Sequence, residues 1–136
     1  FVEHFGVRLW VHEAGLHEYA VLPLDPVGFR FNDVLPGGVR ALEIASLCPE
    51  ETAFLVPVDK GILALGDCVI RDNDGRLAFV PDRLMGEDPD GVKQGVLTQL
   101  REHLSQDFAH LVLAHGVPTV GTGREELRDF VARMGS

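Results

Sequence analysis

The sequence has few cysteines, few aromatic side chains and little positive charge, and it contains no long hydrophobic run. Cys48 and Cys68 are its two cysteines, and they lie in separate segments without a C-x-x-C motif. This usage favours reduced thiols in a cytoplasmic protein over a disulfide framework or a cysteine-based zinc site. No apolar run approaches the roughly 20 residues that a membrane-spanning helix needs, so no membrane association is expected.

Positive charge is scarce and scattered along the chain. Twelve Lys and Arg stand against 21 Asp and Glu, which gives a formal net charge of −9. Because nucleic-acid affinity depends on clustered Lys and Arg, we expect no nucleic-acid partner. The opening residues FVEHFGVRLW lack the basic region and apolar core of a secretory leader, and they resemble the last turns of an amphipathic helix inside a domain.

The remaining composition is that of an ordinary globular chain. Hydrophobic residues make up 46% and charged residues 24% of the sequence, which predicts a single domain over residues 1–136. Short apolar runs rich in β-formers predict strands. Their expected ranges are 7–12, 29–31, 39–45, 52–58, 61–70 and 111–114. Turn residues at 59–61 and 74–75 predict two hairpins between neighbouring runs.

Two helices are expected in the second half of the chain. Asp88 and Pro89 have the spacing of an N-cap and a first helical residue. An apolar stripe with helical spacing follows them, formed by Val92, Val96, Leu97, Leu100 and Leu104. Thr122 and Glu125 have capping-box spacing at the start of the last helix. This order of elements predicts an α+β fold, with helices on one face of a mostly antiparallel or mixed sheet.

The segment VHEAGLHEYA contains a near miss of the metalloprotease motif H-E-x-x-H. His12 and His17 are one residue too far apart, because residues five apart on a helix point about 140° away from each other. His12 also falls within the expected first strand. We therefore interpret both as surface histidines at a junction between a strand and a helix.

Two apolar runs each end in a polar side chain next to a glycine. Asp67 follows Gly66 at the end of a buried run, where a carboxylate needs a partner or a cation. His115 precedes Gly116 at the end of the run LVLA. Taken alone, Asp67 could accept backbone N–H groups in a turn and His115 could be a structural histidine. If both ends lie at one sheet edge, a carboxylate and an imidazole converge, as in a metal site or an acid–base pair.

Two other segments contribute weaker candidates. The turn SLCPEET places Glu51 directly before a strand, where it is either a ligand or an exposed acid. Arg83 lies in the loop 79–91, where it could bind an anionic substrate or simply be a solvated loop residue.

In this order, the three segments resemble the second half of the metallo-β-lactamase fold. Members of that family carry a PGHT turn whose His binds a metal, a GD whose Asp bridges two metals, and a late GHG or AHG whose His binds the second metal. The equivalents in this chain are PEET at 49–52, GD at 66–67 and AHG at 114–116. The resemblance implies that residues 1–136 are the C-terminal half to two-thirds of an αββα sandwich. It also implies one or two zinc, iron or manganese ions and hydrolysis by metal-activated water.

Carried over residue by residue, the resemblance makes Asp67 the bridging carboxylate and His115 a ligand of the second metal. Glu51 stands in place of the PGHT histidine, and a carboxylate can also bind zinc or a harder metal. The family signature H-x-H-x-D-H is absent from this sequence.

Two hypotheses about function follow from this pattern. The first is a metal-dependent hydrolase that acts on a small-molecule substrate of unknown identity. The second is a non-catalytic scaffold or binding protein of the same fold that has lost its metal site. An exposed sheet face would favour a homo-oligomer.

Overall fold

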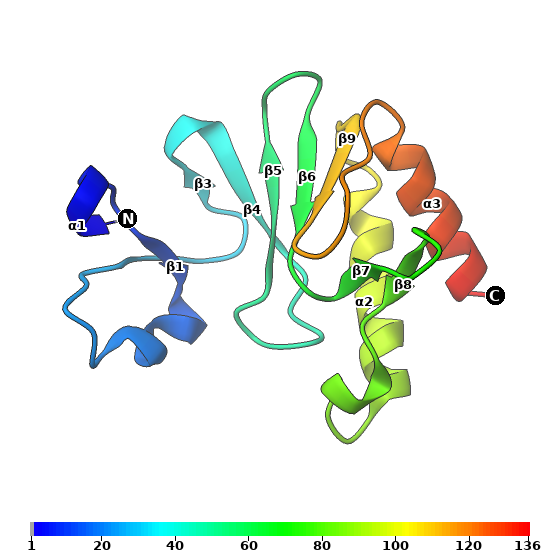
Figure 1. Cartoon of the computed structure of the whole chain (residues 1–136), viewed down its shortest axis with the longest axis horizontal. Coiled ribbons are helices and arrows are strands. Elements are labelled where there is room, and N and C mark those ends of the chain that lie inside the picture. Colours follow the sequence, from blue (N-terminus) through cyan, green and yellow to red (C-terminus); the bar gives the residue numbers. More distant parts are fainter. Residues whose placement is uncertain (1) are drawn as a thin grey trace.

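A computed structural model describes residues 2–136, and a five-stranded mixed sheet forms its centre (Figure 1). The strand order is β3-β4-β5-β6-β9, and every pair is antiparallel except β6–β9, which is parallel. The strands are β3 (Val34–Leu35), β4 (Val39–Glu43), β5 (Thr52–Val56), β6 (Ile62–Leu65) and β9 (His110–Leu113). A short 3₁₀ helix, η2 (Pro36–Gly38), joins β3 to β4.

Helices α2 (Pro89–His103) and α3 (Gly123–Met134) cover one face of this sheet (Figure 1). Alternate strand residues point towards the helices and are buried, among them Leu42, Ala53, Leu63, Leu65, Leu111 and Leu113. The helices contribute Val96, Leu97, Leu100, Leu127, Phe130 and Val131 to the same core. The predicted α+β architecture is confirmed. The apolar face of the sheet, with its two-residue period, packs against the apolar stripes of the helices, with their 3.6-residue period.

The two helices begin in different ways. The Oδ1 atom of Asp88 accepts a hydrogen bond from Gly91 N at 3.0 Å, and Pro89 is the first helical residue, as predicted. The capping box predicted at Thr122 is wrong, since its side chain makes no capping hydrogen bond. The backbone of Thr122 (φ −126°, ψ 21°) lies outside the extended conformation usual for an N-cap. Gly123 N instead donates to Ala109 O at 2.9 Å, which ties α3 to the start of β9.

The strand expected over 61–70 is two strands in different sheets. After β6 the chain bends through residues 66–68 and continues as β7 (Val69–Arg71), which pairs with β8 (Leu77–Phe79). The bend arises because the N–H groups of Asp67 and Cys68 turn towards a side chain instead of a strand partner. The β7–β8 hairpin forms at the predicted turn and packs on α3. A further 3₁₀ helix, η3 (Asp82–Leu84), precedes α2.

The predicted hairpin between β5 and β6 is confirmed. Asp59, Lys60 and Gly61 all have positive φ angles, of 44°, 68° and 86°. A Cβ atom at Gly61 would overlap the carbonyl oxygen of Asp107. The turn therefore requires glycine at this position, both for its backbone conformation and for space.

The N-terminal part of the chain lies against the other face of the sheet (Figure 1). It contains α1 (Val2–Phe5), β1 (Trp10–His12), the 3₁₀ helix η1 (Glu13–Tyr19) and β2 (Val27–Phe29). The parallel pair β1–β2 replaces the strands expected over 7–12 and 29–31. His12 ends β1, as expected from the strand pattern, so no α-helix runs through His12 and His17.

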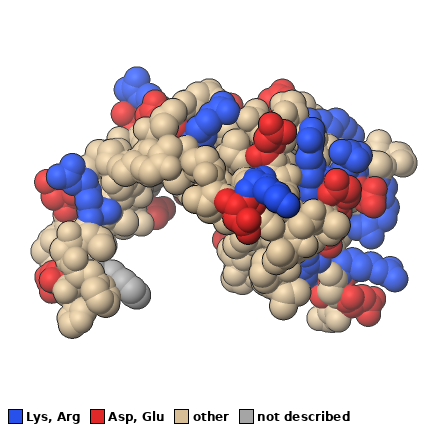
Figure 2. Space-filling view, turned by 90° about the horizontal axis from the view of Figure 1, so that it is seen from above, with Lys and Arg blue, Asp and Glu red and all other residues tan. Residues whose placement is uncertain are grey.

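An apolar groove of about 780 Å³ separates this N-terminal part from the sheet, and the space-filling view is hollowed there (Figure 2). Trp10 lines the groove on one side, and Phe54 and Val56 of β5 line it on the other. The ring of Phe29 reaches the sheet at Phe54, with ring centroids 5.8 Å apart. None of the helices within residues 2–136 is long and apolar enough to cross a membrane.

Candidate functional site

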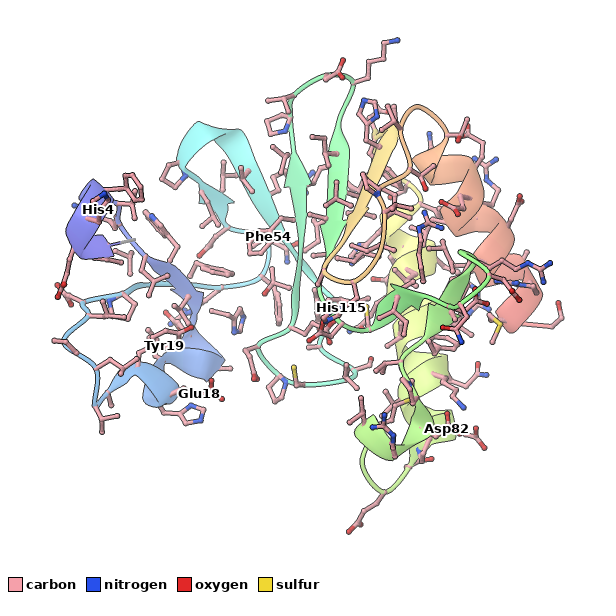
Figure 3. The ribbon with its side chains drawn as sticks, viewed as in Figure 1. His4, Glu18, Tyr19, Phe54, Asp82 and His115 are labelled. Carbon is pink, nitrogen blue, oxygen red and sulfur yellow. The ribbon has the colours of Figure 1, made fainter. Side chains whose placement is uncertain are left out.

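The structure brings Asp67 and His115 together just beyond the carboxyl ends of two neighbouring strands. Figure 3 labels His115 at this edge of the sheet. Leu65 and Leu113 are partners in the parallel β6–β9 ladder, and Ala114 N extends the ladder by donating to Leu65 O at 3.0 Å. The next residues in register are Asp67 and His115, whose Oδ1 and Nε2 atoms lie 3.1 Å apart. Parallel pairing thus explains why two residues 48 positions apart in the sequence meet.

Both side chains of this pair are open to solvent. The His115 side chain is 70% exposed and that of Asp67 is 62% exposed. Asp67 does follow the buried strand β6, as expected, but its carboxylate is not buried there, because the bend after Gly66 turns its side chain outwards. An exposed ion pair of this kind contributes little to the free energy of unfolding. Because both side chains are exposed, both remain accessible to a ligand.

Glu51 lies beside this pair and is buried, with 8% of its surface exposed. Its Oε1 atom accepts hydrogen bonds from Asp67 N at 2.9 Å and Cys68 N at 2.7 Å. Its Oε2 atom is buried without a hydrogen-bond partner among the residues that the structure describes. The interpretation of Glu51 as an exposed acid is therefore wrong.

The topology of the sheet explains the position of Glu51. It directly precedes β5, and β5 runs antiparallel to β6, so the residue before one strand faces the residues after the other. Burial raises the pKa of the Glu51 carboxyl, although the hydrogen bonds from Cys68 oppose this shift. The carboxyl group holds the backbone of Asp67 in place.

The two cysteines are free, as expected, and neither favours a thiolate. Burial, with the nearby carboxylates as a smaller cause, raises the pKa of the Cys48 thiol to about 11. Burial raises the pKa of the Cys68 thiol still further above its ordinary value. Since metals bind the thiolate, cysteine ligation at this site is disfavoured at neutral pH.

The side chains at the site fit a metal ion only in part. Asp67 and His115 offer an oxygen and a nitrogen donor on one exposed edge. Glu51 is engaged with two backbone amides, and residues 2–136 contain no group of three His, Cys, Asp or Glu side chains placed to hold an ion. A catalytic zinc site takes three protein ligands, so Asp67 and His115 are two candidate donors and not a complete set.

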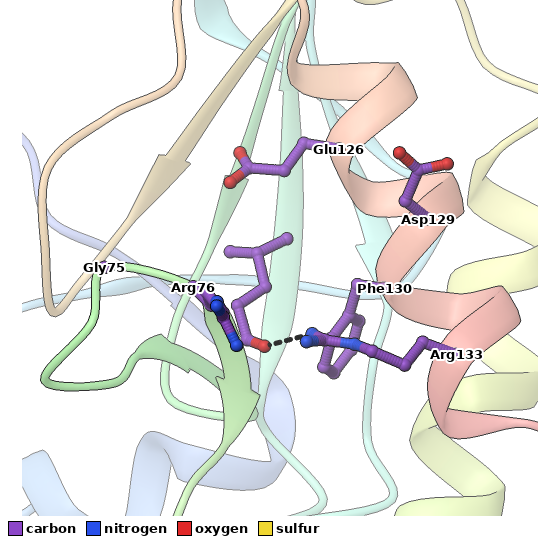
Figure 4. A pocket seen from close by; sticks show the side chains of 7 residues that line it. Gly75, Arg76, Glu126, Asp129, Phe130 and Arg133 are labelled. Carbon is purple, nitrogen blue, oxygen red and sulfur yellow. Dashed lines mark hydrogen bonds between the residues drawn. The ribbon is translucent and has the colours of Figure 1, made fainter.

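Arg83 is not brought to this site. It is an exposed residue of η3, and its neighbour Asp82 lies well away from His115 in Figure 3. A separate surface pocket of about 290 Å³ lies beside α3, and Glu126, Phe130 and Arg133 help to line it (Figure 4). The Nη2 atom of Arg133 donates to Leu77 O there at 2.7 Å, which ties this side chain to β8.

Sequence reasoning missed Arg71, which contacts the segment that carries His115. Arg71 N donates to His115 O at 3.3 Å, and its guanidinium is almost fully buried. An arginine at the end of a short strand has no distinctive sequence pattern. The Gly116 that follows His115 is the one local signal of a close approach.

Comparison with solved structures finds a chain of similar fold. The chain superposes on a metallo-beta-lactamase family protein from Thermus thermophilus with a TM-score of 0.61 and 14% sequence identity, over 95% of its length. The fold therefore resembles part of the fold of that protein. The match covers 53% of the Thermus chain, so the present chain spans about half the length of the structure it matches. No family model and no curated protein matches the sequence, so the likeness establishes the fold alone.

Proposed function

We propose that this chain contributes Asp67 and His115 as metal ligands to a metal-dependent hydrolase of the metallo-β-lactamase type. The observation that carries the proposal is the 3.1 Å approach of Asp67 Oδ1 to His115 Nε2 at adjacent strand ends. The metallo-β-lactamase fold around these residues supports it. The remaining ligands would come from residues outside these 136.

Each residue of the site has a distinct role in this proposal. A bound zinc, iron or manganese ion would supply a water molecule of lowered pKa as nucleophile. Asp67 and His115 would hold the ion, and Glu51 would fix the backbone of Asp67 through the hydrogen bond to its N–H group. The substrate in this proposal is a small molecule; Arg83, which lies on η3 apart from the site, takes no part in binding it. The formal net charge of −9 argues against a nucleic-acid substrate.

Metal content tests this proposal directly. The protein is produced with all flanking sequence that its gene encodes, purified without chelator and analysed by elemental mass spectrometry. We expect about one or two equivalents of zinc, iron or manganese, and a loss of bound metal in both Asp67→Ala and His115→Ala. His17→Ala and Asp74→Ala remove an exposed histidine and an exposed acid elsewhere and serve as controls. Unchanged metal content in both site variants would refute the assignment.

A non-catalytic scaffold is the second candidate, and the hydrogen bonding of Glu51 favours it. This side chain occupies the place of a metal-binding histidine in the resemblance, yet it binds two backbone amides. A folded protein that takes up no zinc, iron or manganese from excess ion would support a scaffold. Stoichiometric metal together with turnover of an ester, thioester or phosphodiester would exclude it.

A further inference from the structure

Arg71, the last residue of β7, has a side chain that is 8% exposed and fully hydrogen-bonded. Its Nε atom donates to Val117 O at 2.7 Å, and its Nη1 atom donates to Gly75 O and Glu126 Oε1, each at 2.7 Å. Its Nη2 atom donates to Thr119 Oγ1 and to Glu126 Oε2 at 3.0 Å. All five N–H donors of the guanidinium are therefore used.

These contacts converge on residues 114–121, the segment that carries His115. Leu111 and Thr119 exchange two backbone hydrogen bonds of 2.9 Å, which close the base of the segment. The Arg71 guanidinium holds the segment at two points, the carbonyl of Val117 and the hydroxyl of Thr119. The backbone N–H of Arg71 adds a third hydrogen bond, to His115 O.

Gly116 shows how closely Arg71 packs against this segment. Its φ angle is 118°, and a Cβ atom built there would lie 2.8 Å from Arg71 Cγ. A side chain at this position would push the arginine away or move the backbone next to His115.

Glu126 anchors the arginine to helix α3. The two side chains form a bidentate pair, and Thr119 Oγ1 also donates to Glu126 Oε2. Paired carboxylate and guanidinium groups of this geometry are strong and directional. In Figure 4, Glu126 extends from α3 towards the hairpin of β7 and β8. The segment that carries His115 is thus tied to both the hairpin and the helix.

We propose that Arg71 is a positioning residue that fixes the 114–121 segment and thereby holds the His115 imidazole beside the Asp67 carboxylate. The Arg71 guanidinium does not reach either side chain; it acts through its hydrogen bonds to Val117 O and Thr119 Oγ1, in the segment that follows His115. The effect of Arg71 on bound metal rests on the proposed function. Its effect on the position of residues 114–121 does not. Groups that orient a ligand typically change metal affinity by roughly 10- to 100-fold when they are removed.

The test compares Arg71→Met and Arg71→Lys with Arg124→Met as the matched control. Arg124 is also a partly buried arginine, but it donates to Leu104 O and leaves the 114–121 segment untouched. In the metal-free protein, NMR measures amide exchange at Thr119 and the nuclear Overhauser contact between the His115 ring and the Asp67 methylene. In the protein with all its flanking sequence, zinc titration gives the affinity at equal folded fraction.

We expect Arg71→Met to speed exchange at Thr119 by about tenfold or more and to abolish the His115–Asp67 contact. Zinc affinity falls by roughly 10- to 100-fold. Arg71→Lys gives a smaller change, because lysine keeps the charge but not the bidentate geometry. Arg124→Met leaves all three readouts unchanged.

The inference would be overturned if Arg71→Met kept the wild-type exchange rate at Thr119, the His115–Asp67 contact and the wild-type zinc affinity. If Arg71→Met does not fold, Arg71→Lys makes the same comparison, and wild-type readouts there would overturn it equally. The failure of the proposed function is a separate result. Metal retained by His115→Ala rejects the ligand assignment, while exchange and the ring contact still decide the role of Arg71.

Discussion

Replacing Glu51 separates its backbone hydrogen bonds from its charge. Glu51→Ala removes the oxygen that accepts from Asp67 N and Cys68 N. Glu51→Gln keeps an acceptor oxygen of the same reach and removes the buried negative charge. The amide nitrogen of glutamine takes the place of Oε2, which has no hydrogen-bond partner among the described residues.

The magnitudes follow from these contacts. A hydrogen bond to a charged group contributes about 1.5–3 kcal/mol, and a buried donor left unpaired costs about 1–3 kcal/mol. The Cys68 amide is buried, whereas water can reach the partly buried Asp67 amide once the side chain is gone. We therefore expect Glu51→Ala to lower the free energy of unfolding by about 2–4 kcal/mol. Glu51→Gln should change it by less than about 1 kcal/mol, because the loss of charge-assisted bonding is offset by relief of a buried charge.

Urea unfolding followed by circular dichroism measures these differences, at neutral pH and with chelator present so that metal does not contribute. The m-value should stay constant, so the shift in midpoint reports stability. Glu87→Ala, which removes an exposed glutamate from the loop before α2, is the control. A loss under about 1 kcal/mol for Glu51→Ala, or equal losses for Ala and Gln, would refute the role assigned to Glu51.

Three other predictions test the fold and its titratable groups. Burial lowers the pKa of His103, which donates from Nε2 to Glu43 O at 2.6 Å. The unfolded chain then binds the proton more readily, so stability falls as the pH drops below about 6.5, and His103→Gln should flatten this slope in urea unfolding between about pH 5 and 7.5. Gly61→Ala meets both a positive φ and a steric overlap and should cost about 2–4 kcal/mol in thermal unfolding; a loss below about 1 kcal/mol contradicts the geometry. At about pH 8, a disulfide reagent should label Cys48 slowly and Cys68 only after unfolding; fast labelling of Cys68 in the native state would contradict its burial.

Sequence patterns predicted those helices and hairpins that are determined by neighbouring residues, such as caps, apolar stripes and turns. The apolar stripe and the Asp88 cap predicted α2, and the turn residues predicted both hairpins. The break at residues 66–68 was missed, because a distant carboxylate bends the chain within an apolar run. The Thr122 cap failed because contact with β9 sets the backbone at the start of α3.

The candidate site was only partly accessible to sequence reasoning. Two strand ends with a polar residue beside glycine predicted that Asp67 and His115 could meet, and the parallel β6–β9 register places them in contact. The burial of Glu51 depends on which strand pairs with β5. The residues around Glu51 do not indicate that pairing. The contacts of Arg71 depend on two distant segments, at Val117 and at Glu126, as well as on Gly75 in its own hairpin, so no local pattern predicts them.

The parallel pairing of β6 with β9 also sets an order of assembly during synthesis. β6 is complete at residue 65, but its partner on that side begins at residue 110, after the whole of α2. Until then the nascent chain presents an open strand edge, the kind of surface that recruits other chains. Asp67 gains its histidine neighbour only when β9 has left the ribosome, and Arg71 gains its carboxylate only with α3. The residues from β9 onwards therefore complete a site whose earlier members, Asp67 and Arg71, are synthesised well before them.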